Sequence, residues 1–345
     1  MTESPLVSII LLNYNGKSLS QYWQSIFLES YANKEVIFVD NGSADGSAAS
    51  FVGLTERFPA TPTRLVTLPK NVGYSQGNNE GVKFARGEFI CLLGNDVEVD
   101  SNWIQPVLDV FNADPGIGCV LPAIFRMSDR SQPDLPWTEM DPFGFTHRLQ
   151  PTGASVQKVF FTEGTSMFFR RSLLDRLGYL FPSEYFFMHD DVDFCWRAKL
   201  LGFSSVVASQ SRVFHVRGGT EPGVLLKRNP RPIQTGTRNR LATMFTNYSG
   251  AHVASFLPFT MLGELTIATA FQSRRMRSES RAVLRGLAAF VRDLPALRTR
   301  RSAVQRSRRV PDSTILSEMT DPLQTPRYLI GNWQQVANPR TDVIR

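Results

Sequence analysis

The chain has 345 residues, a formal net charge of +7 at pH 7 and 42% hydrophobic residues. This length allows one large domain or two, and the composition excludes wholesale disorder, collagen and a coiled coil. Its three cysteines, Cys91, Cys119 and Cys195, are widely spaced and form no CxxC pair. No disulfide framework or structural zinc site is therefore indicated, and a reducing compartment is favoured.

The positive charge is concentrated near the C-terminus. Twelve arginines between Arg274 and Arg309 are accompanied only by Glu279 and Asp293, so the rest of the chain is mildly acidic. A partner for this segment must be anionic, which means a membrane surface or a nucleic acid. The N-terminus has no basic region and its apolar run ends at Leu12, so we expect no signal peptide.

Short β-rich runs alternate with helix-like stretches in the first hundred residues. The expected strands are 7–12, 36–39, 64–67 and 88–93, and the expected helices between them are 18–30, 45–57 and 76–86. This alternation predicts βαβ units and a mostly parallel, doubly wound α/β sheet. Ligands of such sheets bind beyond the carboxyl ends of the strands, so the residues that follow each run are the first candidates for a site.

Those residues are unusually polar. They are Asn13, Tyr14 and Asn15 after the first run, Asp40 and Asn41 after the second, Asn71 and Gly73 after the third, and Asn95 and Asp96 after the fourth. Asp40 is placed to accept hydrogen bonds from a base or ribose, and Asp45 or Ser43 can cap the next helix, but an ordinary strand-to-helix turn has the same spacing.

The segment 71–81 contains three glycines and three asparagines and opens a helix. Glycines let a backbone approach a nucleotide closely, and side-chain amides can fix its polar groups. The segment is neither a Walker A loop nor a GxGxxG fingerprint, which disfavours ATPases and NAD enzymes. Asp96 follows an apolar strand, where a carboxylate serves either as a ligand for a divalent cation or as a cap.

Beyond Trp103 the pattern is irregular, and residues 128–151 predict a long loop. A second cluster, 159–215, is expected to complete the same sheet with strands at 166–169 and 205–208 and a helix at 192–201.

This helix starts in the motif Asp190-Asp191-Val192-Asp193. Three carboxylates suit the positive end of a helix dipole, and crowding raises the pKa of at least one toward that of a general base. Arg197 lies on the same helical face as Asp193 and can hold that carboxylate in place. The alternative is a solvated, acidic helix start with no catalytic role.

Two further helix-like segments follow. Residues 251–271 are mostly apolar but include His252, Pro258 and Glu264, which favours an interfacial or re-entrant helix over a membrane span. From 281 to 294 a helical projection separates one arginine face from one apolar face, the first made of Arg281, Arg285 and Arg292 and the second of Val283, Leu284, Leu287, Phe290, Val291 and Leu294.

This separation predicts a helix lying on an anionic bilayer, with a helix docked on the protein's own core as the alternative. Nucleic acid is not expected as the partner, because the basic run lacks interleaved aromatics and a nucleic-acid-binding module.

Taken together, the motifs resemble the family 2 glycosyltransferases, and within them the bacterial rhamnosyltransferases of surface-polysaccharide assembly. The matching residues are 7–10 with 13–16, 40–47, 71–81, Asp96, 163–165 with Arg170 and Arg171, 190–197, and His215 followed by Gly218. The likeness covers about two thirds of the chain, and the ordered set is specific although each motif alone is not.

The resemblance implies a GT-A fold and an inverting sugar transfer that uses Mg²⁺ or Mn²⁺. By this likeness Asp191 would be the catalytic base, and Asp96 and His215 would meet the metal. The nucleotide sugar would be held by Asn13, Tyr14, Asp40, Asn71, Gly73, Asn79 and Asp96. Asp190, Asp193, Arg197 and Gly164 would lie at the acceptor or support these groups.

The same likeness suggests three segments: a GT-A domain at 1–240, membrane-associated helices at 241–310 and a tail at 311–345. The expected partners are a nucleotide-diphosphate sugar such as dTDP-rhamnose, a lipid-linked saccharide acceptor and an anionic membrane surface. The expected location is peripheral, on the cytoplasmic face of the inner membrane.

Two departures from the family pattern stand out. The metal motif, often Asp-x-Asp, is Gly94-Asn95-Asp96 here, and Asp190 stands where relatives often carry Glu. The missing carboxylate leaves open a non-catalytic relative that binds nucleotide sugar or glycan. A sugar-phosphate nucleotidyltransferase is a further alternative, although residues 13–17 lack the basic, glycine-rich loop it would need.

The sugar-transfer interpretation requires one spatial arrangement. Asp40, Asp96, Asp191 and His215 must gather around a single crevice at the rim of the sheet.

Overall fold

The computed structural model describes residues 4–216 and 230–321. Gly218, one of the residues that carry the family resemblance, lies outside the described residues. The described chain forms two compact units. The sheet unit comprises residues 4–138, 148–186 and 203–216, and the helical unit comprises residues 139–147, 187–202 and 230–321.

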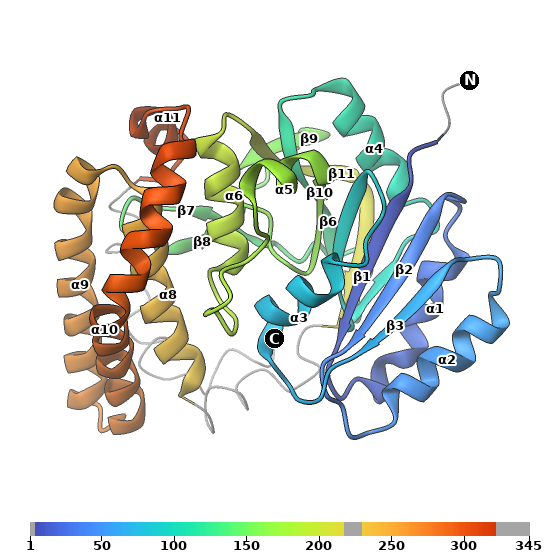
Figure 1. Cartoon of the computed structure of the whole chain (residues 1–345), viewed down its shortest axis with the longest axis horizontal. Helices are drawn as coiled ribbons and strands as arrows, with labels where there is room; N and C mark the ends of the chain where they lie inside the picture. The colour runs from blue at the N-terminus through green and yellow to red at the C-terminus, as the bar shows by residue number, and fades with distance from the viewer. Residues whose placement is uncertain (1–3, 217–229, 322–345) are drawn as a thin grey trace. The chain divides into compact units, whose positions relative to one another are not determined.

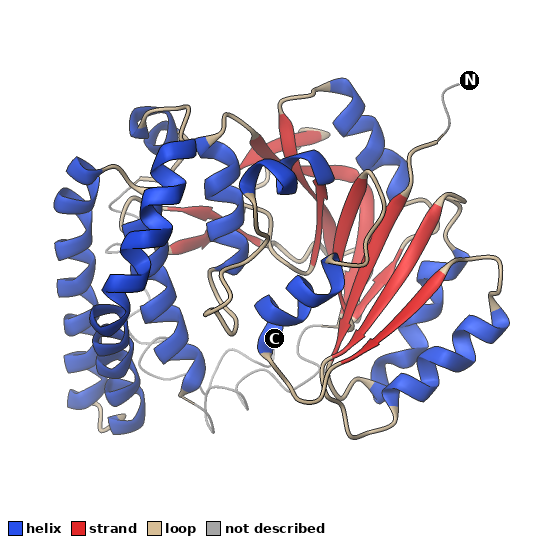
Figure 2. Ribbon diagram, in the orientation of Figure 1, coloured by secondary structure: helices blue, strands red, loops and turns tan. Residues whose placement is uncertain are grey.

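A twisted sheet forms the centre of the sheet unit (Figure 2). Within the described residues its strand order is β3-β2-β1-β4-β10-β6-β11-β5, with β9 paired to β11. The strands are β1 (Val7–Asn13), β2 (Lys34–Asp40), β3 (Thr63–Thr67), β4 (Phe89–Gly94), β5 (Val97–Val99), β6 (Ile117–Arg126), β9 (Val156–Val159), β10 (Ser166–Arg170) and β11 (Ser204–His215). The four strands β3, β2, β1 and β4 are mutually parallel, and β10 joins them antiparallel to β4.

Helices cover both faces of this sheet (Figure 1). They are α1 (Ser20–Leu28), α2 (Ser47–Arg57), α3 (Gly73–Val82), α4 (Ile104–Ala113) and α5 (Arg171–Leu177), with a short 3-10 turn at Lys17–Leu19. Alternate side chains of β1 point to opposite faces. Val7, Ile9 and Leu11 join the core cluster that includes Trp23 and Ile26 of α1.

The residues of β1 between them face α3. Side chains of Ile10 and Leu12 lie so close to Gly81 and Gly77 that a Cβ at either glycine would be 2.6 Å from them. The glycines of the 71–81 segment therefore let α3 pack tightly on the parallel strands.

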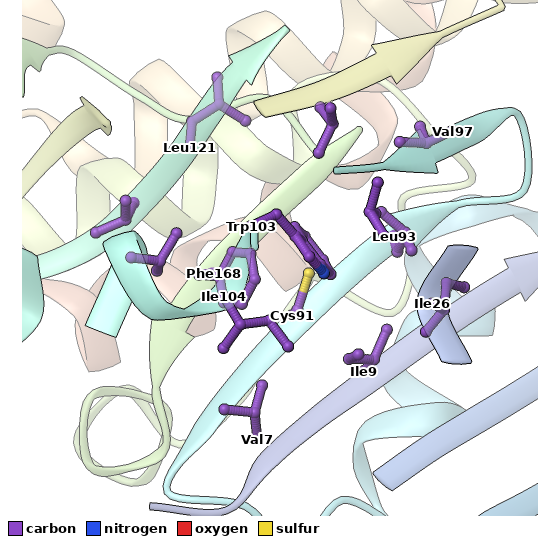
Figure 3. Close-up of a cluster of buried hydrophobic side chains, with 14 of the residues drawn as sticks. Val7, Ile9, Ile26, Cys91, Leu93, Val97, Trp103, Ile104, Leu121 and Phe168 are labelled. Atoms are coloured by element: carbon purple, nitrogen blue, oxygen red, sulfur yellow. The ribbon is translucent and has the colours of Figure 1, made fainter. Parts of the chain in front are cut away.

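The core cluster lies between the sheet and helices α1 and α4 (Figure 3). Cys91 of β4 is buried there beside Trp103 and Phe168, whose rings pack edge to face at 4.8 Å. All three cysteines are buried and none forms a disulfide, in agreement with the absence of a disulfide framework.

The predicted α/β sheet is confirmed, and so are its four N-terminal strands. Helix α3 begins three residues earlier than predicted, at Gly73, and ends at Val82. The second cluster does complete the same sheet, through β10 and β11, and β11 extends beyond the predicted 205–208 to His215.

Two expectations beyond Trp103 are wrong. That region is regular, because Ile104, Val107, Leu108 and Phe111 recur at helical spacing and form the buried face of α4, which β6 follows. Residues 128–151 also are not one long loop. They contain β7 (Trp137–Met140) and β8 (Thr146–Arg148), which form a separate two-stranded sheet.

The described part of the helical unit contains α6 (Asp190–Leu200), α8 (Arg231–Asn247), α9 (Gly250–Ser273), α10 (Arg277–Ser307) and α11 (Asp312–Ser317). Helices α8, α9 and α10 lie side by side (Figure 1). Val283, Leu287 and Phe290 of α10 are buried, and a Cβ at Gly286 would lie 2.7 Å from the Gln234 carbonyl oxygen of α8.

This packing corrects the prediction that the apolar face at 281–294 is immersed in a bilayer. Most of that face is used within the protein, as in the docked-helix alternative. Leu284 and Val291 are its exposed members, with 46% and 52% of their surface accessible.

Helix α9 is continuous over 24 residues although it contains Pro258. Within the described residues it is the one helix long and apolar enough to cross a membrane, a criterion of length and composition that the core helix of a soluble protein also meets. Glu264 interrupts its apolar sequence because it faces α8, where it accepts hydrogen bonds from Arg240 and Thr237 at 2.6 and 3.0 Å.

The two compact units are not consecutive in sequence. Residues 139–147 and 187–202 belong with the C-terminal helices, so the division into 1–240, 241–310 and 311–345 stays a prediction about the tasks of these segments.

Candidate active site

The carboxyl ends of β1, β2 and β4 lie at one edge of the sheet. The strand register places Asn13 of β1 beside Asp40 of β2, and Leu12 beside Gly94 of β4. Because these strands are parallel, the polar loops that follow them all leave from this edge. The sheet therefore brings together the strand-end residues that the sequence indicated.

Asn13 connects three of these loops. Its amide nitrogen donates to the Oγ atoms of Ser43 and Ser47 at 3.2 and 2.9 Å, and its oxygen accepts from the Asn95 amide at 2.9 Å. Asn13 itself is fully buried. The next residue, Tyr14, has 48% of its surface exposed, so an aromatic ring is presented directly beside a rigid hydrogen-bonded junction.

The loop after β2 is held by its own polar groups. Asp40 is only 3% exposed and accepts the Ser43 amide at 3.2 Å. Asp45 accepts the amide of Ser47, the first residue of α2, at 3.0 Å, which confirms its predicted place at the start of that helix.

Asn41 is a strand-end residue to which the sequence assigned no specific role. Its oxygen accepts the Val72 amide at 2.9 Å and its nitrogen donates to the Gly73 carbonyl at 3.1 Å, so it fixes the loop that follows β3. The available signal was its position directly after a strand-end aspartate.

The start of α3 is shaped by Asn71 and Gly73. The Asn71 side-chain oxygen accepts the Gly73 amide at 2.8 Å. Gly73 has a φ of 90°, and a Cβ there would lie 2.3 Å from the Phe186 carbonyl oxygen. Only glycine satisfies both conditions.

Asn79, in the C-terminal half of α3, forms hydrogen bonds with the backbone of a segment that is distant in sequence. Its amide makes two hydrogen bonds with the backbone of Phe181, at 3.0 and 3.1 Å. Asn13, Asn71 and Asn79 thus have partners within the protein, and their predicted contacts with a nucleotide stay predictions.

Gly164 lies against the same helix. Its carbonyl accepts the Tyr74 hydroxyl at 2.7 Å, and a Cβ at Gly164 would lie 2.2 Å from that hydroxyl oxygen. The absence of a side chain at 164 is therefore needed for this contact.

Asp96 and His215 form an ion pair at the end of the sheet. Strands β5 and β11 are antiparallel and pair His215 with Val97, which brings the imidazole Nε2 to 3.1 Å from Asp96 Oδ2. Burial raises the pKa of the Asp96 carboxyl, but the hydrogen bond from His215 and its positive charge outweigh burial and lower that pKa.

The His215 imidazole is surrounded by carboxylates. Burial lowers its pKa, but hydrogen bonds to Asp134 and Asp96 and the charges of Asp96 and Glu163 outweigh burial and raise it to about 9. Asp134 is 3% exposed, with Oδ2 at 3.8 Å from His215 Nδ1. His215 is therefore protonated at neutral pH, and this end of the sheet is rich in oxygen ligands.

Gly94 lies close to the Asp96 carboxylate. A Cβ at this position would lie 2.8 Å from Asp96 Oδ1. A side chain at 94 would therefore require the Asp96 carboxylate to shift. Within the described residues no group of three or more His, Cys, Asp or Glu side chains is arranged to hold a metal ion.

The acidic motif begins α6 in the helical unit. Asp193 is fully buried and accepts a hydrogen bond from Arg197 Nε at 2.7 Å, so the predicted pair is confirmed. Asp190 is 4% exposed, and Asp191 is partly exposed with Oδ1 accepting the Val192 amide at 2.8 Å. These carboxylates sit at the positive end of the helix dipole, as expected.

The sheet edge and the acidic motif belong to different compact units. The structure brings together the strand-end residues, Asp96 and His215 on one side, and Asp190, Asp191, Asp193 and Arg197 on the other. That Asp191 joins Asp40, Asp96 and His215 around one crevice stays a prediction.

Comparison with known proteins identifies the class. A family model described as glycosyl transferase family 2 matches residues 8–178, a range that includes the whole strand-end cluster except His215. The amylovoran biosynthesis glycosyltransferase AmsB of Erwinia amylovora is 26% identical over 209 residues, which is 59% of this chain and 67% of that protein.

A second relative is an N-acetylglucosaminyl-diphospho-decaprenol L-rhamnosyltransferase of Mycobacterium tuberculosis. It is 24% identical over 238 residues, or 61% of this chain and 76% of the relative. The chain spans between 25% and 67% of the length of the first four curated relatives it matches.

Among solved structures, the mannosyltransferase PcManGT from Pyrobaculum calidifontis, in complex with GDP-Man and Mn²⁺, is similar with a TM-score of 0.55. The sequences are 18% identical, and the match covers 88% of this chain and 87% of the other. At this identity the likeness concerns the fold.

The fold is that of the GT-A glycosyltransferases, with a largely parallel sheet and C-terminal helices. The chain belongs to the family 2 glycosyltransferases and is an enzyme of that class. This assignment favours sugar transfer over the two alternatives left open by the sequence, a non-catalytic binding module and a sugar-phosphate nucleotidyltransferase.

Proposed function

We propose that the enzyme transfers a sugar from a nucleotide-diphosphate donor to an acceptor hydroxyl with inversion at the anomeric carbon. The observation that carries this proposal is the edge of the parallel sheet. There the loops after β1, β2 and β4 are cross-linked by Asn13 and end at the Asp96–His215 pair. An edge of this kind is where α/β sheets bind nucleotides.

In this proposal the strand-end loops hold the donor. Tyr14 is exposed and can stack on the base, and Asp40 follows β2 where the ribose would lie. Asn13, Asn71 and Asn79 shape the loops through their contacts with protein atoms. Gly73 lets the backbone at the start of α3 approach neighbouring groups closely.

The residues at the end of the sheet suit a divalent cation that they share with the donor diphosphate. Mg²⁺ is usually bound by one or two carboxylates together with substrate phosphates, and Asp96 with the nearby Asp134 supplies such oxygens. We propose that Asp96 holds Mg²⁺ or Mn²⁺ against the donor diphosphate, and that His215 joins it as a ligand once the cation displaces its proton. The cation would neutralise the negative charge that develops on the leaving nucleoside diphosphate.

Asp191 is the proposed base. Its carboxylate lies at the first turn of α6 and is partly exposed, while its neighbours Asp190 and Asp193 are buried. Asp191 is therefore the member of the motif best placed to meet a substrate. Asp191 lies five residues after Phe186. The Phe186 carbonyl oxygen accepts a hydrogen bond from the Ser75 amide of α3.

The chemical step then balances as follows. The acceptor oxygen forms a bond to the anomeric carbon as the bond from that carbon to the diphosphate oxygen breaks. The bonding pair leaves with the nucleoside diphosphate, and the hydroxyl proton passes to the Asp191 carboxylate. A single displacement inverts the anomeric configuration.

Asp191→Asn tests the role of the base. General-base assistance is worth about 10²- to 10⁴-fold, so we expect turnover to fall in this range while the dissociation constant of the donor stays within about twofold. Donor binding is measured by calorimetry and turnover by release of nucleoside diphosphate. Wild-type turnover in this variant would show that another group takes the proton.

Two controls complete the test. Asp109→Asn alters a carboxylate on α4 in the sheet unit and should change neither quantity. Chelation followed by addition of Mn²⁺ should abolish and restore turnover in the wild-type enzyme, and Asp96→Asn should raise the Mn²⁺ concentration needed for half-maximal rate.

The donor is proposed to be dTDP-rhamnose, with the rhamnosyltransferase relative of M. tuberculosis as its support. Donor binding raises the apparent stability of the folded enzyme. A panel of nucleotide sugars followed by thermal unfolding should therefore show the largest shift with dTDP-rhamnose. A larger shift with another nucleotide sugar would replace this assignment.

We also propose a lipid-linked saccharide as the acceptor, at a membrane surface on the cytoplasmic side of the inner membrane. The name of the same relative includes a decaprenol diphosphate acceptor. In this chain the support is the outward face of α9, where Phe259, Leu262 and Leu265 are 65%, 60% and 44% exposed. Over its 24 residues α9 contains no Lys, Arg or Asp, and its one Glu is buried.

Exposed arginines follow α9 in the sequence. Arg275 and Arg277 are at the turn between α9 and α10, and Arg281 and Arg285 follow on α10. An exposed apolar stripe followed in the chain by exposed guanidinium groups suits a helix that lies in the headgroup region of an anionic bilayer. Because Glu264 and Thr260 use the opposite face of α9 within the protein, an interfacial position is favoured over a span.

Leu262→Asp tests this surface. Burial of one leucine is worth about 1.5–3 kcal/mol, so we expect at least about a tenfold loss of binding to vesicles that contain phosphatidylglycerol, measured by sedimentation. Leu28→Asp, at a leucine of α1 that is 63% exposed, is the matched control and should bind normally. Absence of binding by the wild-type enzyme would remove the membrane from the proposal.

A further inference from the structure

The turn that precedes α6 has an unfavourable backbone conformation. Met188 and His189 have φ values of 74° and 61°, so two consecutive residues with side chains adopt the left-handed region. Residues other than glycine rarely do this, and the conformation persists only where the surroundings impose it. The turn ends at Asp190 and therefore sets the direction in which the acidic motif leaves.

Asn239 of α8 supplies such a constraint. Its side-chain nitrogen donates to two successive carbonyl oxygens, Phe187 O at 3.0 Å and Met188 O at 2.9 Å. Asn239 is 2% exposed. One amide group therefore binds the carbonyl that precedes Met188 and the carbonyl that precedes His189. Because Asn239 is buried, water does not compete for these bonds.

A second layer orients this amide. Arg238 Nη1 donates to Asn239 Oδ1 at 3.0 Å, which requires the amide nitrogen to face the carbonyls. Arg238 is held in turn by Asp293 of α10, whose Oδ2 accepts from Nε at 3.1 Å and from Nη2 at 2.8 Å. The contacts thus run from α10 through α8 to the turn before α6.

His189 makes its own contacts at this turn. The His189 carbonyl accepts the Asp193 amide at 3.0 Å, a bond that belongs to the start of α6. The His189 ring is partly buried, and its buried Nδ1 atom has no hydrogen-bond partner.

We propose that Asn239 is a positioning residue for the transfer reaction: it holds the left-handed turn at 188–189 and thereby the orientation of Asp191. This inference rests on the proposed role of Asp191 as the base. It also gives the helices after residue 230 a task in catalysis that is separate from membrane binding. Arg238, which contacts Asn239, and Asp293, which contacts Arg238, support the same task.

The test is Asn239→Ala in the full-length enzyme. Because misplacement of a reacting group by about 1 Å can cost about 100-fold in rate, we expect kcat to fall about 10- to 100-fold. The dissociation constant of the donor should remain within about twofold, since the donor residues belong to the sheet unit. Thr246→Val is the matched control: Thr246 is buried in α8 and its hydroxyl bonds only to carbonyls of the same helix, so its kcat should be unchanged.

Rescue by glycine separates positioning from general stabilisation. Glycine adopts the left-handed region without steric cost, so Met188→Gly in the Asn239→Ala background should recover at least about tenfold of the lost kcat. A residue that only stabilised α8 would give no such recovery. Loss of kcat without rescue, or wild-type kcat in Asn239→Ala, would overturn the proposal.

Failure of a variant to fold and failure of the base assignment can both be distinguished from failure of the positioning role. If Asn239→Ala does not fold, Asp293→Asn takes its place, and it should lower kcat about threefold or more with unchanged donor binding; wild-type kcat would count against the proposal. If Asp191→Asn keeps wild-type turnover, the base assignment fails. If Asp191→Asn is inactive while Asn239→Ala is normal, the positioning role alone fails.

Discussion

Replacement of Gly73 by alanine tests whether the start of α3 is built on its contact with Phe186. Gly73 has a φ of 90°, and an added Cβ would lie 2.3 Å from the Phe186 carbonyl oxygen and 2.7 Å from two carbons of its ring. Atoms do not approach this closely in folded proteins, so either the loop at 71–73 or the segment at 186 has to move.

The expected loss of stability can be divided with a matched glycine. Gly178, after α5, has a φ of 80° and no atom within 4 Å of an added Cβ. A left-handed alanine costs about 1–2 kcal/mol, and restriction of the unfolded chain returns about 0.4–1 kcal/mol. Gly178→Ala should therefore lose about 1 kcal/mol. Gly73→Ala should lose about 2–4 kcal/mol, because overpacking adds about 1–3 kcal/mol.

Urea unfolding of the two variants, followed by circular dichroism, measures this difference. Calorimetric titration with the nucleotide-sugar donor should show weaker binding in Gly73→Ala and unchanged binding in Gly178→Ala, because only the first displaces a loop at the sheet edge. Equal losses of stability in the two variants, or normal donor binding in Gly73→Ala, would refute the view that this contact shapes the donor site.

Three further predictions follow from buried or exposed polar groups. Burial, and then the charge of Arg240, lower the pKa of His189 from 6.5 to about 3. Between these two pH values the unfolded chain binds a proton that the folded chain does not, so the free energy of unfolding should fall by about 2 kcal/mol from pH 7 to pH 5. His189→Asn should remove this part of the acid sensitivity measured by urea unfolding. Glu264→Gln removes the buried carboxylate that pairs with Arg240, whose side chain is 17% exposed, and should lose about 3–5 kcal/mol in the same assay. Glu98 pairs with the half-exposed Arg130, so Glu98→Gln should lose less than about 1 kcal/mol. Tyr14→Ala should weaken donor binding by about 1–3 kcal/mol in calorimetry if the ring stacks on the base, while Tyr14→Phe should bind normally; equal affinities in all three proteins would place the base elsewhere.

The parallel half of the fold could be predicted from the sequence because its signals are local. Each of the first four strands is a short apolar run, and each is followed by polar residues where the strand ends. The same kind of signal existed for α4, whose apolar residues recur at helical spacing. Strands β7 and β8 carried no such signal, since they are only a few residues long and the turn between them depends on Asp141, which accepts the amides of Phe143 and Phe145.

The site residues could be located but their partners could not. A strand-end position is readable from local pattern, yet Asn79 bonds to Phe181, 102 residues away in the sequence. The apolar face of α10 shows the corresponding limit. Periodicity identified Val283, Leu287 and Phe290 as one face, but it does not say what covers that face. The covering helix, α8, has few apolar residues and contacts α10 closely through Gly286.

Four consecutive residues of α8 bind the neighbouring helices α9 and α10 and the turn before α6. Thr237 and Arg240 bind the buried Glu264 of α9, while Arg238 and Asn239 bind Asp293 of α10 and the turn before α6. The helix proposed to contact lipid and the turn proposed to orient Asp191 are therefore fixed to the same short segment. On this arrangement, weakening the contact between α9 and α8 should affect transfer to an acceptor in vesicles and to a soluble acceptor alike, because both require Asp191. A change confined to the exposed face of α9, such as Leu262→Asp, should reduce only the first.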